Sequence, residues 1–177
     1  MPHILVATLD DEPGVLDRVA SLCRRRAFNI HSLTVSPSGE PGTSRMTLAV
    51  ETDDAGLLRV AASLEKLINV SRVEHHLPHY AVIRDLALVR VHAPESARPQ
   101  VMQIAQIFRA QVVDLTLDSL VLEVTGGIEK LNRFVEVLRP YGVLELSRSG
   151  AVAMARGASS AIVAGKPPED SVPTMLV

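Results

Sequence analysis

The stretch that decides the fold runs from Ile4 to Leu16 and reads ILVATLDDEPGVL. Its first half is an apolar run of the length and composition typical of a buried strand. The polar turn that follows contains Pro13 and Gly14. Proline suits the first turn of a helix, because a backbone N–H at that position has no hydrogen-bond partner inside the helix and its loss costs nothing there. Glycine has no side chain, so another group can approach its backbone closely. After the turn, apolar residues recur at helical spacing, namely Val15, Leu16, Val19, Leu22 and Cys23. The stretch therefore predicts a strand, a tight turn and an amphipathic helix.

The residues after this helix complete a recognisable order of elements. Residues 29–35 and 45–50 alternate as strands around the Pro- and Gly-containing turn 37–42, which predicts a hairpin. A second apolar stripe over residues 57–68 predicts a helix, and a short strand follows at residues 70–75. The order βαββαβ predicts a ferredoxin-like α+β domain, an antiparallel sheet with two helices on one face.

The same order then repeats, so we expect two ferredoxin-like domains in tandem. The predicted elements are a strand at 87–91, a helix at 101–108, a hairpin at 112–117 and 119–125, a helix at 131–138 and a last strand at 143–146. The predicted boundaries are a first domain at 1–77, a linker at 78–83, a second domain at 84–157 and a flexible tail at 158–177.

Composition argues against two classes of partner. The chain of 177 residues has a formal net charge of −2, and no apolar run is long enough to span a bilayer, so we expect no membrane partner. RNA-binding sheets of this shape stack bases on exposed aromatic residues. Here Phe28, Phe108 and Phe134 fall at helix ends or in apolar stripes, so we expect no nucleic acid. Residues 1–3 run straight into the first strand without a leader-like segment, which favours a cytoplasmic protein.

No set of residues indicates catalysis. Cys23 falls on a helix packing face, and no serine lies in a Gly-x-Ser-x-Gly elbow. We interpret His75, His76 and His79 as solvated linker residues rather than metal ligands, because they lack metal-ligand spacing. The run 24–26 is three arginines, which either complement the dipole at a helix C-terminus or form a basic patch. We therefore predict a non-catalytic chain without a metal site.

Several motifs together indicate a family. Residues 11–16 (DEPGVL), 25–35 (RRAFNIHSLTV) and 44–47 (SRMT) closely resemble the small, regulatory subunit of acetohydroxyacid synthase, also called acetolactate synthase. Matching segments follow in order at 66–70, 84–91, 108–110, 123–126 and 148–150, so that the resemblance covers about residues 1–157.

The resemblance implies a fold, a partner and a function. It implies an N-terminal ACT domain, which is a small-molecule sensor fold, followed by an ACT-like domain. The implied partner is the large catalytic subunit, which holds thiamine diphosphate, Mg²⁺ and FAD and acts in valine, leucine and isoleucine biosynthesis. The small subunit of this family does no chemistry and is implied to hold no cofactor. It raises the activity of the large subunit and confers feedback inhibition by a branched-chain amino acid, usually valine.

The residues offer a binding site for such an effector. The free N–H groups at a helix start attract a carboxylate, and the amide of Asn29 can pair with an ammonium or a carboxylate. Asp11 stands where the family often has Asn and can pair with an ammonium, whereas Leu16, Ile30 and Leu33 are candidates for an apolar wall. In this family the ligand lies where two ACT domains meet, which implies a homodimer. The predicted effector-binding residues are Asp11, Pro13, Gly14, Val15, Leu16, Asn29 and Ile30.

Two other functions remain open at this point. One is a stand-alone amino-acid sensor that regulates another enzyme or transcription, although no helix-turn-helix pattern is evident. The other is a small enzyme, which the absence of a converging acid–base or nucleophile set disfavours. Co-purification with a large thiamine-dependent protein would favour the regulatory subunit over both.

Overall fold

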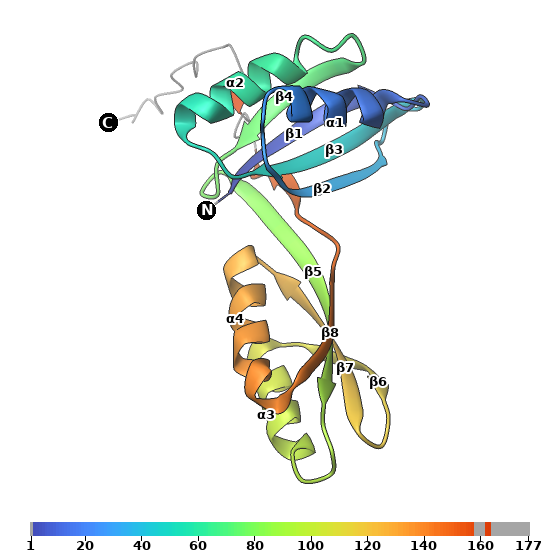
Figure 1. Cartoon of the computed structure of the whole chain (residues 1–177), viewed down its shortest axis with the longest axis vertical. Helices are drawn as coiled ribbons and strands as arrows, with labels where there is room; N and C mark the ends of the chain where they lie inside the picture. Colours follow the sequence, from blue (N-terminus) through green and yellow to red (C-terminus); the bar gives the residue numbers. More distant parts are fainter. Residues whose placement is uncertain (1, 158–161, 164–177) are drawn as a thin grey trace, which may run out of the picture. The chain divides into compact units, whose positions relative to one another are not determined.

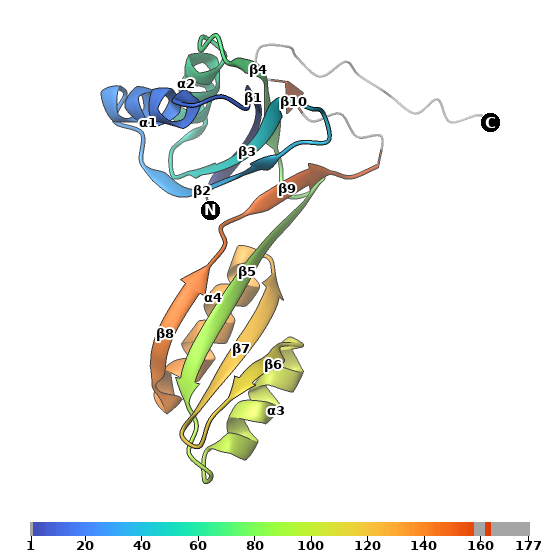
Figure 2. The ribbon, with the colours of Figure 1, turned by 90° about the vertical axis from the view of Figure 1, so that its right-hand side faces the viewer.

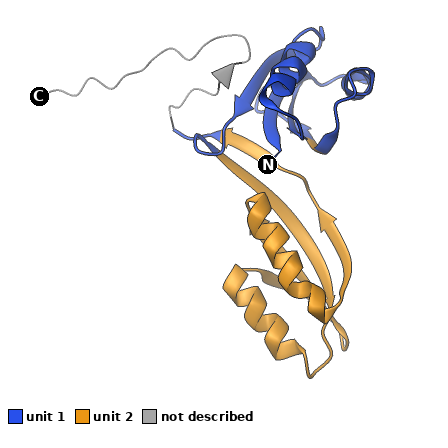
Figure 3. Cartoon of the chain, turned by 60° about the vertical axis from the view of Figure 1, so that its left-hand side comes forward, with its two compact units in different colours: residues 1–31, 35–81, 155–177 blue, residues 32–34, 82–154 orange. Residues whose placement is uncertain are grey.

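The computed structural model describes residues 2–157 and 162–163, which fall into two compact units. Of the described residues, unit 1 contains those up to His31, Val35–Ala81 and those from Ala155 on, and unit 2 contains Ser32–Thr34 and Val82–Met154 (Figure 3). The predicted flexible tail, residues 158–177, lies outside the described residues except for Ile162 and Val163.

Unit 1 has the predicted ferredoxin-like order. Its elements are β1 (His3–Asp10), α1 (Val15–Arg25), β2 (Ile30–Pro37), β3 (Thr43–Val50), α2 (Asp54–Leu64), β4 (Val70–His76) and β10 (Ile162–Val163). The strand order is β10-β4-β1-β3-β2, and β1 is antiparallel to both of its neighbours. α1 and α2 lie together on one face of this sheet (Figures 1 and 2).

Alternation along β1 and helical spacing along α1 build the core of unit 1. Leu5, Ala7 and Leu9 are spaced two apart in β1, as expected for one face of a strand, and each is at most 1% exposed. α1 places Val15, Val19, Leu22 and Cys23 in the same core, which confirms the predicted apolar face for these four residues, whereas Leu16 is 46% exposed and lies outside the core. Burial of each such aliphatic side chain stabilises the fold by about 1.5–3 kcal/mol, which fixes α1 on the sheet.

The C-terminal end of α1 is closed by a Schellman motif. Ala27 adopts a left-handed conformation with φ 54°, the Phe28 N–H donates to the Cys23 carbonyl at 2.9 Å, and the Ala27 N–H donates to the Arg24 carbonyl at 3.2 Å. The reversal packs Phe28 against the core and directs the chain into β2. It therefore fixes the position of the segment that precedes the strand.

Unit 2 repeats the architecture, as the sequence predicted. Its elements are β5 (Ala81–His92), α3 (Arg98–Phe108), β6 (Gln111–Leu115), β7 (Ser119–Gly126), α4 (Ile128–Leu138), the 3₁₀ turn η1 (Arg139–Tyr141), β8 (Val143–Arg148) and β9 (Val152–Ala155). The strand order is β6-β7-β5-β8, with antiparallel pairs, and α3 and α4 cover one face (Figure 2). Phe108 and Phe134 meet in its core with ring centroids 5.2 Å apart. The fold class expected from the sequence is confirmed in both units.

Two details of unit 2 differ from the sequence expectation. β5 begins at Ala81, so the second half of the predicted linker 78–83 belongs to a strand. The sheet does not end at β8, because β9 also pairs with β5. β5 is long enough to pair with β8 along one part of its length and with β9 along another. The short apolar segment 87–91, from which the strand was predicted, does not reveal this length.

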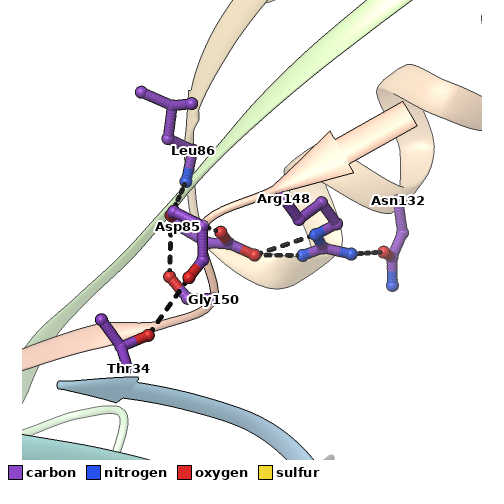
Figure 4. Close-up of polar contacts among 7 residues, drawn as sticks. Thr34, Asp85, Leu86, Asn132, Arg148 and Gly150 are labelled. Carbon is purple, nitrogen blue, oxygen red and sulfur yellow. Dashed lines mark hydrogen bonds and ion pairs between the residues drawn. The ribbon is translucent and has the colours of Figure 1, made fainter. Parts of the chain in front are cut away.

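A buried carboxylate joins three elements of unit 2 (Figure 4). Asp85 in β5 is 5% exposed, and its Oδ2 accepts from Nε and Nη2 of Arg148 at 2.9 and 2.5 Å. The Ser149 hydroxyl donates to Asp85 Oδ1 at 3.1 Å, and Arg148 Nη1 donates to Asn132 Oδ1 in α4 at 2.9 Å. A buried charge is tolerated when its partner and hydrogen bonds are all present, so this network fixes β8 against β5 and α4.

Each of the four α-helices in the part of the chain that the structure describes has 11 residues. Within the described residues, none of them has the length and apolar character needed to cross a membrane.

Candidate functional site

The turn between β1 and α1 presents an open helix start. Gly14 occupies the N-cap position with φ 86° and ψ −6°, a left-handed conformation that side-chain-bearing residues rarely adopt. A Cβ at this position would meet no atom within 4 Å, and no side chain caps the helix within the described residues. The first N–H groups of a helix have no partner inside it and carry partial positive charge. This turn is therefore suited to hold a small anionic group such as a carboxylate.

The predicted residues of this turn differ in what they can offer. Asp11, Pro13 and Leu16 are exposed, with Leu16 46% exposed, so their side chains are accessible. Val15 is only 4% exposed, its side chain packs in the core, and its N–H donates to the Glu12 carbonyl at 3.4 Å, so the N–H groups that this turn can offer are those of the residues after Val15. The Asp11 N–H donates to the Gly42 carbonyl at 2.9 Å, which anchors the turn to the β2–β3 connection.

The other two predicted residues lie at the opposite end of α1. Asn29 is exposed and Ile30, the first residue of β2, is partly buried. An eleven-residue helix is about 16 Å long, so the turn at Gly14 and the side chain of Asn29 do not converge within one protomer. β2 is one of the two edge strands of the described sheet, and Leu33 on this strand is 39% exposed.

Sequence reasoning missed Asn69, which holds the start of α1 in place. Asn69 is 8% exposed, its Nδ2 donates to Asp10 Oδ2 at 3.0 Å, and its carbonyl accepts from the Asp10 N–H at 3.0 Å. Arg18, one turn into α1, donates to Asn69 Oδ1. Asn69 thus ties the end of β1 to α1, on either side of Gly14. A polar residue immediately before an apolar strand was the available signal.

The interpretation of the linker histidines was wrong for His75 and His76, which lie in a strand rather than in a linker. His75 and His76 belong to β4, and His76 is 3% exposed with its Nε2 3.2 Å from Glu74 Oε2. Burial lowers the pKa of His76 below its ordinary value, and Glu74 opposes part of this shift. Burial and the neighbouring His3 and His76 also lower the pKa of His75. The strand continues through both residues because they pair with Leu5 and Ile4 of β1. His79, in contrast, is exposed.

No group of three or more His, Cys, Asp or Glu side chains suited to a metal ion occurs among the described residues. The one cysteine, Cys23, is buried in the core of unit 1, and burial raises the pKa of its thiol. A protonated, enclosed thiol is a poor nucleophile.

Comparison with known protein families finds a match for each of the two units. The family described as the AHAS small subunit-like ACT domain matches residues 5–72, and the family described as the small subunit of acetolactate synthase matches residues 84–157. The first unit is ferredoxin-like and has an open helix start after its first strand, and a second ferredoxin-like unit follows it. Together with the two family matches, this architecture places the chain among ACT-domain proteins.

Individual proteins that resemble almost the whole chain identify the family more narrowly. The probable acetolactate synthase small subunit of Archaeoglobus fulgidus is 45% identical over 157 residues, which is 89% of this chain and 98% of the relative. The small subunit of Mycolicibacterium smegmatis is 43% identical over 155 residues, covering 88% and 91%. The crystal structure of the small subunit from Thermotoga maritima superimposes with a TM-score of 0.82 at 33% identity, covering 90% and 99%. The chain belongs to the acetolactate synthase small subunit family.

Proposed function

We propose that this chain is the non-catalytic regulatory subunit of an acetolactate synthase. It binds the large, thiamine-diphosphate-dependent catalytic subunit, raises its activity and confers feedback inhibition by a branched-chain amino acid, with valine as the first candidate. Thiamine diphosphate, Mg²⁺ and FAD are held by the catalytic subunit rather than by this chain. The holoenzyme acts in the cytoplasm.

The open helix start at Gly14 is the observation that carries the effector part of the proposal. An α-amino acid presents a carboxylate, an ammonium and, for the branched-chain class, a compact apolar side chain. The first-turn N–H groups receive the carboxylate, and Leu16 beside them offers apolar contact. Asp11 on the same turn is a partner for the ammonium.

Asn29 and Ile30 complete the site from a second copy of the chain. Their distance from Gly14 along α1 requires a partner, and an interface with two-fold symmetry generates two equal sites. The exposed outer strand β2, with Leu33, is the surface through which we propose that the dimer forms. Effector binding between the two copies then favours one arrangement of the dimer over another, which is the means of inhibition.

Co-expression tests this proposal. The tagged chain should co-purify with the acetolactate synthase large subunit of its own source, and adding the chain to the isolated large subunit should increase acetolactate formation. Valine, leucine and isoleucine are titrated into both preparations, with an unrelated amino acid as control. Purification without a large partner, together with unchanged activity on mixing, would contradict the proposal and favour a stand-alone amino-acid sensor.

A further inference from the structure

A cleft of about 320 Å³ in unit 1 is lined by residues from the end of α1 and from α2 and the turn after it. Its lining is formed by Arg26, Phe28, Arg59, Ala62, Ser63 and Lys66. Arg59, Ala62 and Ser63 follow the spacing i, i+3 and i+4 on one stripe of α2, and Lys66 lies in the turn just after this helix ends at Leu64. The cleft therefore has three cationic side chains and an apolar wall.

The walls of this cleft are held in place by the fold. The Schellman motif at the end of α1 fixes Phe28, which packs against the core on its other side. Ser63 is 8% exposed and its hydroxyl donates to the Arg59 carbonyl at 2.6 Å, so it is part of the packed surface of α2.

The positive charge around the cleft is weakly compensated. Arg59 is 3.7 Å from Asp53, and both side chains are largely exposed, at 65% and 73%. Within the described part of the chain, no ion pair joins Arg26 or Lys66 to a carboxylate. Three cations thus gather around one concavity in a chain whose formal net charge is −2. An anion seated there would relieve their mutual repulsion.

We propose that this cleft binds a small phosphorylated organic molecule. Two arginines and a lysine are the side chains that recognise phosphate oxygens, and Phe28 and Ala62 supply apolar contact for the organic part. The volume lies at the lower end of the range for small-ligand sites, which favours a compact ligand over a protein segment. The site is distinct from the turn at Gly14, which lies at the other end of α1.

Phenyl phosphate and inorganic phosphate are the probes that test this site. Each is titrated into the ¹⁵N-labelled full-length chain at about 150 mM salt, so that non-specific attraction is screened. We expect saturable shifts at the amides of Phe28 and Ala62. Phenyl phosphate should bind about tenfold more tightly than inorganic phosphate, because its ring buries apolar area in the cleft.

The double variant Arg59→Met and Lys66→Met should weaken phenyl phosphate binding by at least about tenfold, because each cation contributes a charge-assisted contact. Arg59→Lys keeps the charge and should retain more of the binding than Arg59→Met. Arg133→Met is the matched control, because Arg133 is an exposed cation on α4 of unit 2. Circular dichroism verifies that every variant is folded.

Three outcomes would overturn the proposal. They are the absence of saturable binding, an equal loss in the Arg133→Met control, or equal affinity for phenyl phosphate and free phosphate. The experiment uses neither the amino-acid effector nor the catalytic subunit, so its result is independent of the proposed regulatory function.

Discussion

Replacement of Gly14 by aspartate is the sharpest test of the proposed effector site. The added side chain enters open space, because a Cβ at this position meets no atom within 4 Å. Its carboxylate would lie beside the first-turn N–H groups, where the ligand carboxylate is proposed to bind. The left-handed backbone at φ 86° makes any non-glycine residue cost about 1 kcal/mol of stability, which the fold should tolerate.

The expected loss of affinity follows from charge repulsion. Two carboxylates about 5 Å apart at an effective dielectric constant of about 20 repel each other by about 3 kcal/mol, which is roughly a hundredfold in affinity. The variant should also lose the favourable contact between the helix start and the ligand, because its own carboxylate takes that position. Valine inhibition of the holoenzyme should therefore be lost over concentrations that fully inhibit the unmodified enzyme.

The matched control is Gly14→Asn, which has nearly the same size and the same backbone strain but no charge. Calorimetry measures valine binding to both variants, and an activity assay with the large subunit measures inhibition. We expect Gly14→Asn to bind valine much more tightly than Gly14→Asp, with equal activation by both. Undiminished inhibition of the Gly14→Asp holoenzyme would remove Gly14 from the site. Equal losses in the two variants would show that shape rather than charge is responsible.

Four further outcomes are expected. Asn29→Ala should weaken valine affinity by about 1–3 kcal/mol in calorimetry and change activation much less, whereas an equal loss of both would indicate a structural role. Valine affinity should differ roughly five- to 150-fold between the free chain and the assembled holoenzyme, and identical affinities would mean that the effector does not bias the assembly. Arg148→Met should lower the free energy of unfolding by about 3–5 kcal/mol, because it leaves the Asp85 carboxylate buried without its cation. Adding Asp85→Asn should restore part of that loss in urea titrations, and no recovery would exclude charge burial as the cause. Finally, the free energy of unfolding should fall as the pH is lowered through the ordinary histidine value of 6.5, because burial lowers the pKa of His75 and His76 and the unfolded chain then binds more protons. The slope should be smaller for His76→Gln, and an unchanged slope would assign the pH dependence to other groups.

The elements that could be predicted from sequence are those whose signal is local. The apolar run of β1 and the helical stripe of α1 each lie within about a dozen residues, so the order βαββαβ is readable twice along the chain. β9 and β10 carry no such signal, because they have four and two residues and exist only by pairing with β5 and β4. The burial of His76 is equally non-local, since it follows from pairing with Ile4.

In the candidate site, too, the features that could be predicted are those with a local sequence signal. A Pro-Gly pair before an amphipathic helix identifies the helix start, and the structure places Gly14 there in a conformation that favours glycine. The role of Asn69 depends on contacts with Asp10 and Arg18, which are distant in sequence, so its place before an apolar strand could single out the residue but not its partners. Whether Asn29 of one copy approaches Gly14 of another is a property of an assembly and stays a prediction.

β10 has a consequence for the order in which the protein is made. Its two residues, Ile162 and Val163, pair with His75 and Glu74 of β4 and cover part of that strand's outer edge. Synthesis proceeds from the N-terminus, so β4 leaves the ribosome nearly 90 residues before the strand that covers it. An unpaired edge invites pairing with another chain. The growing polypeptide therefore exposes a self-association surface during translation, and the same surface would remain open in any fragment that ends before β10.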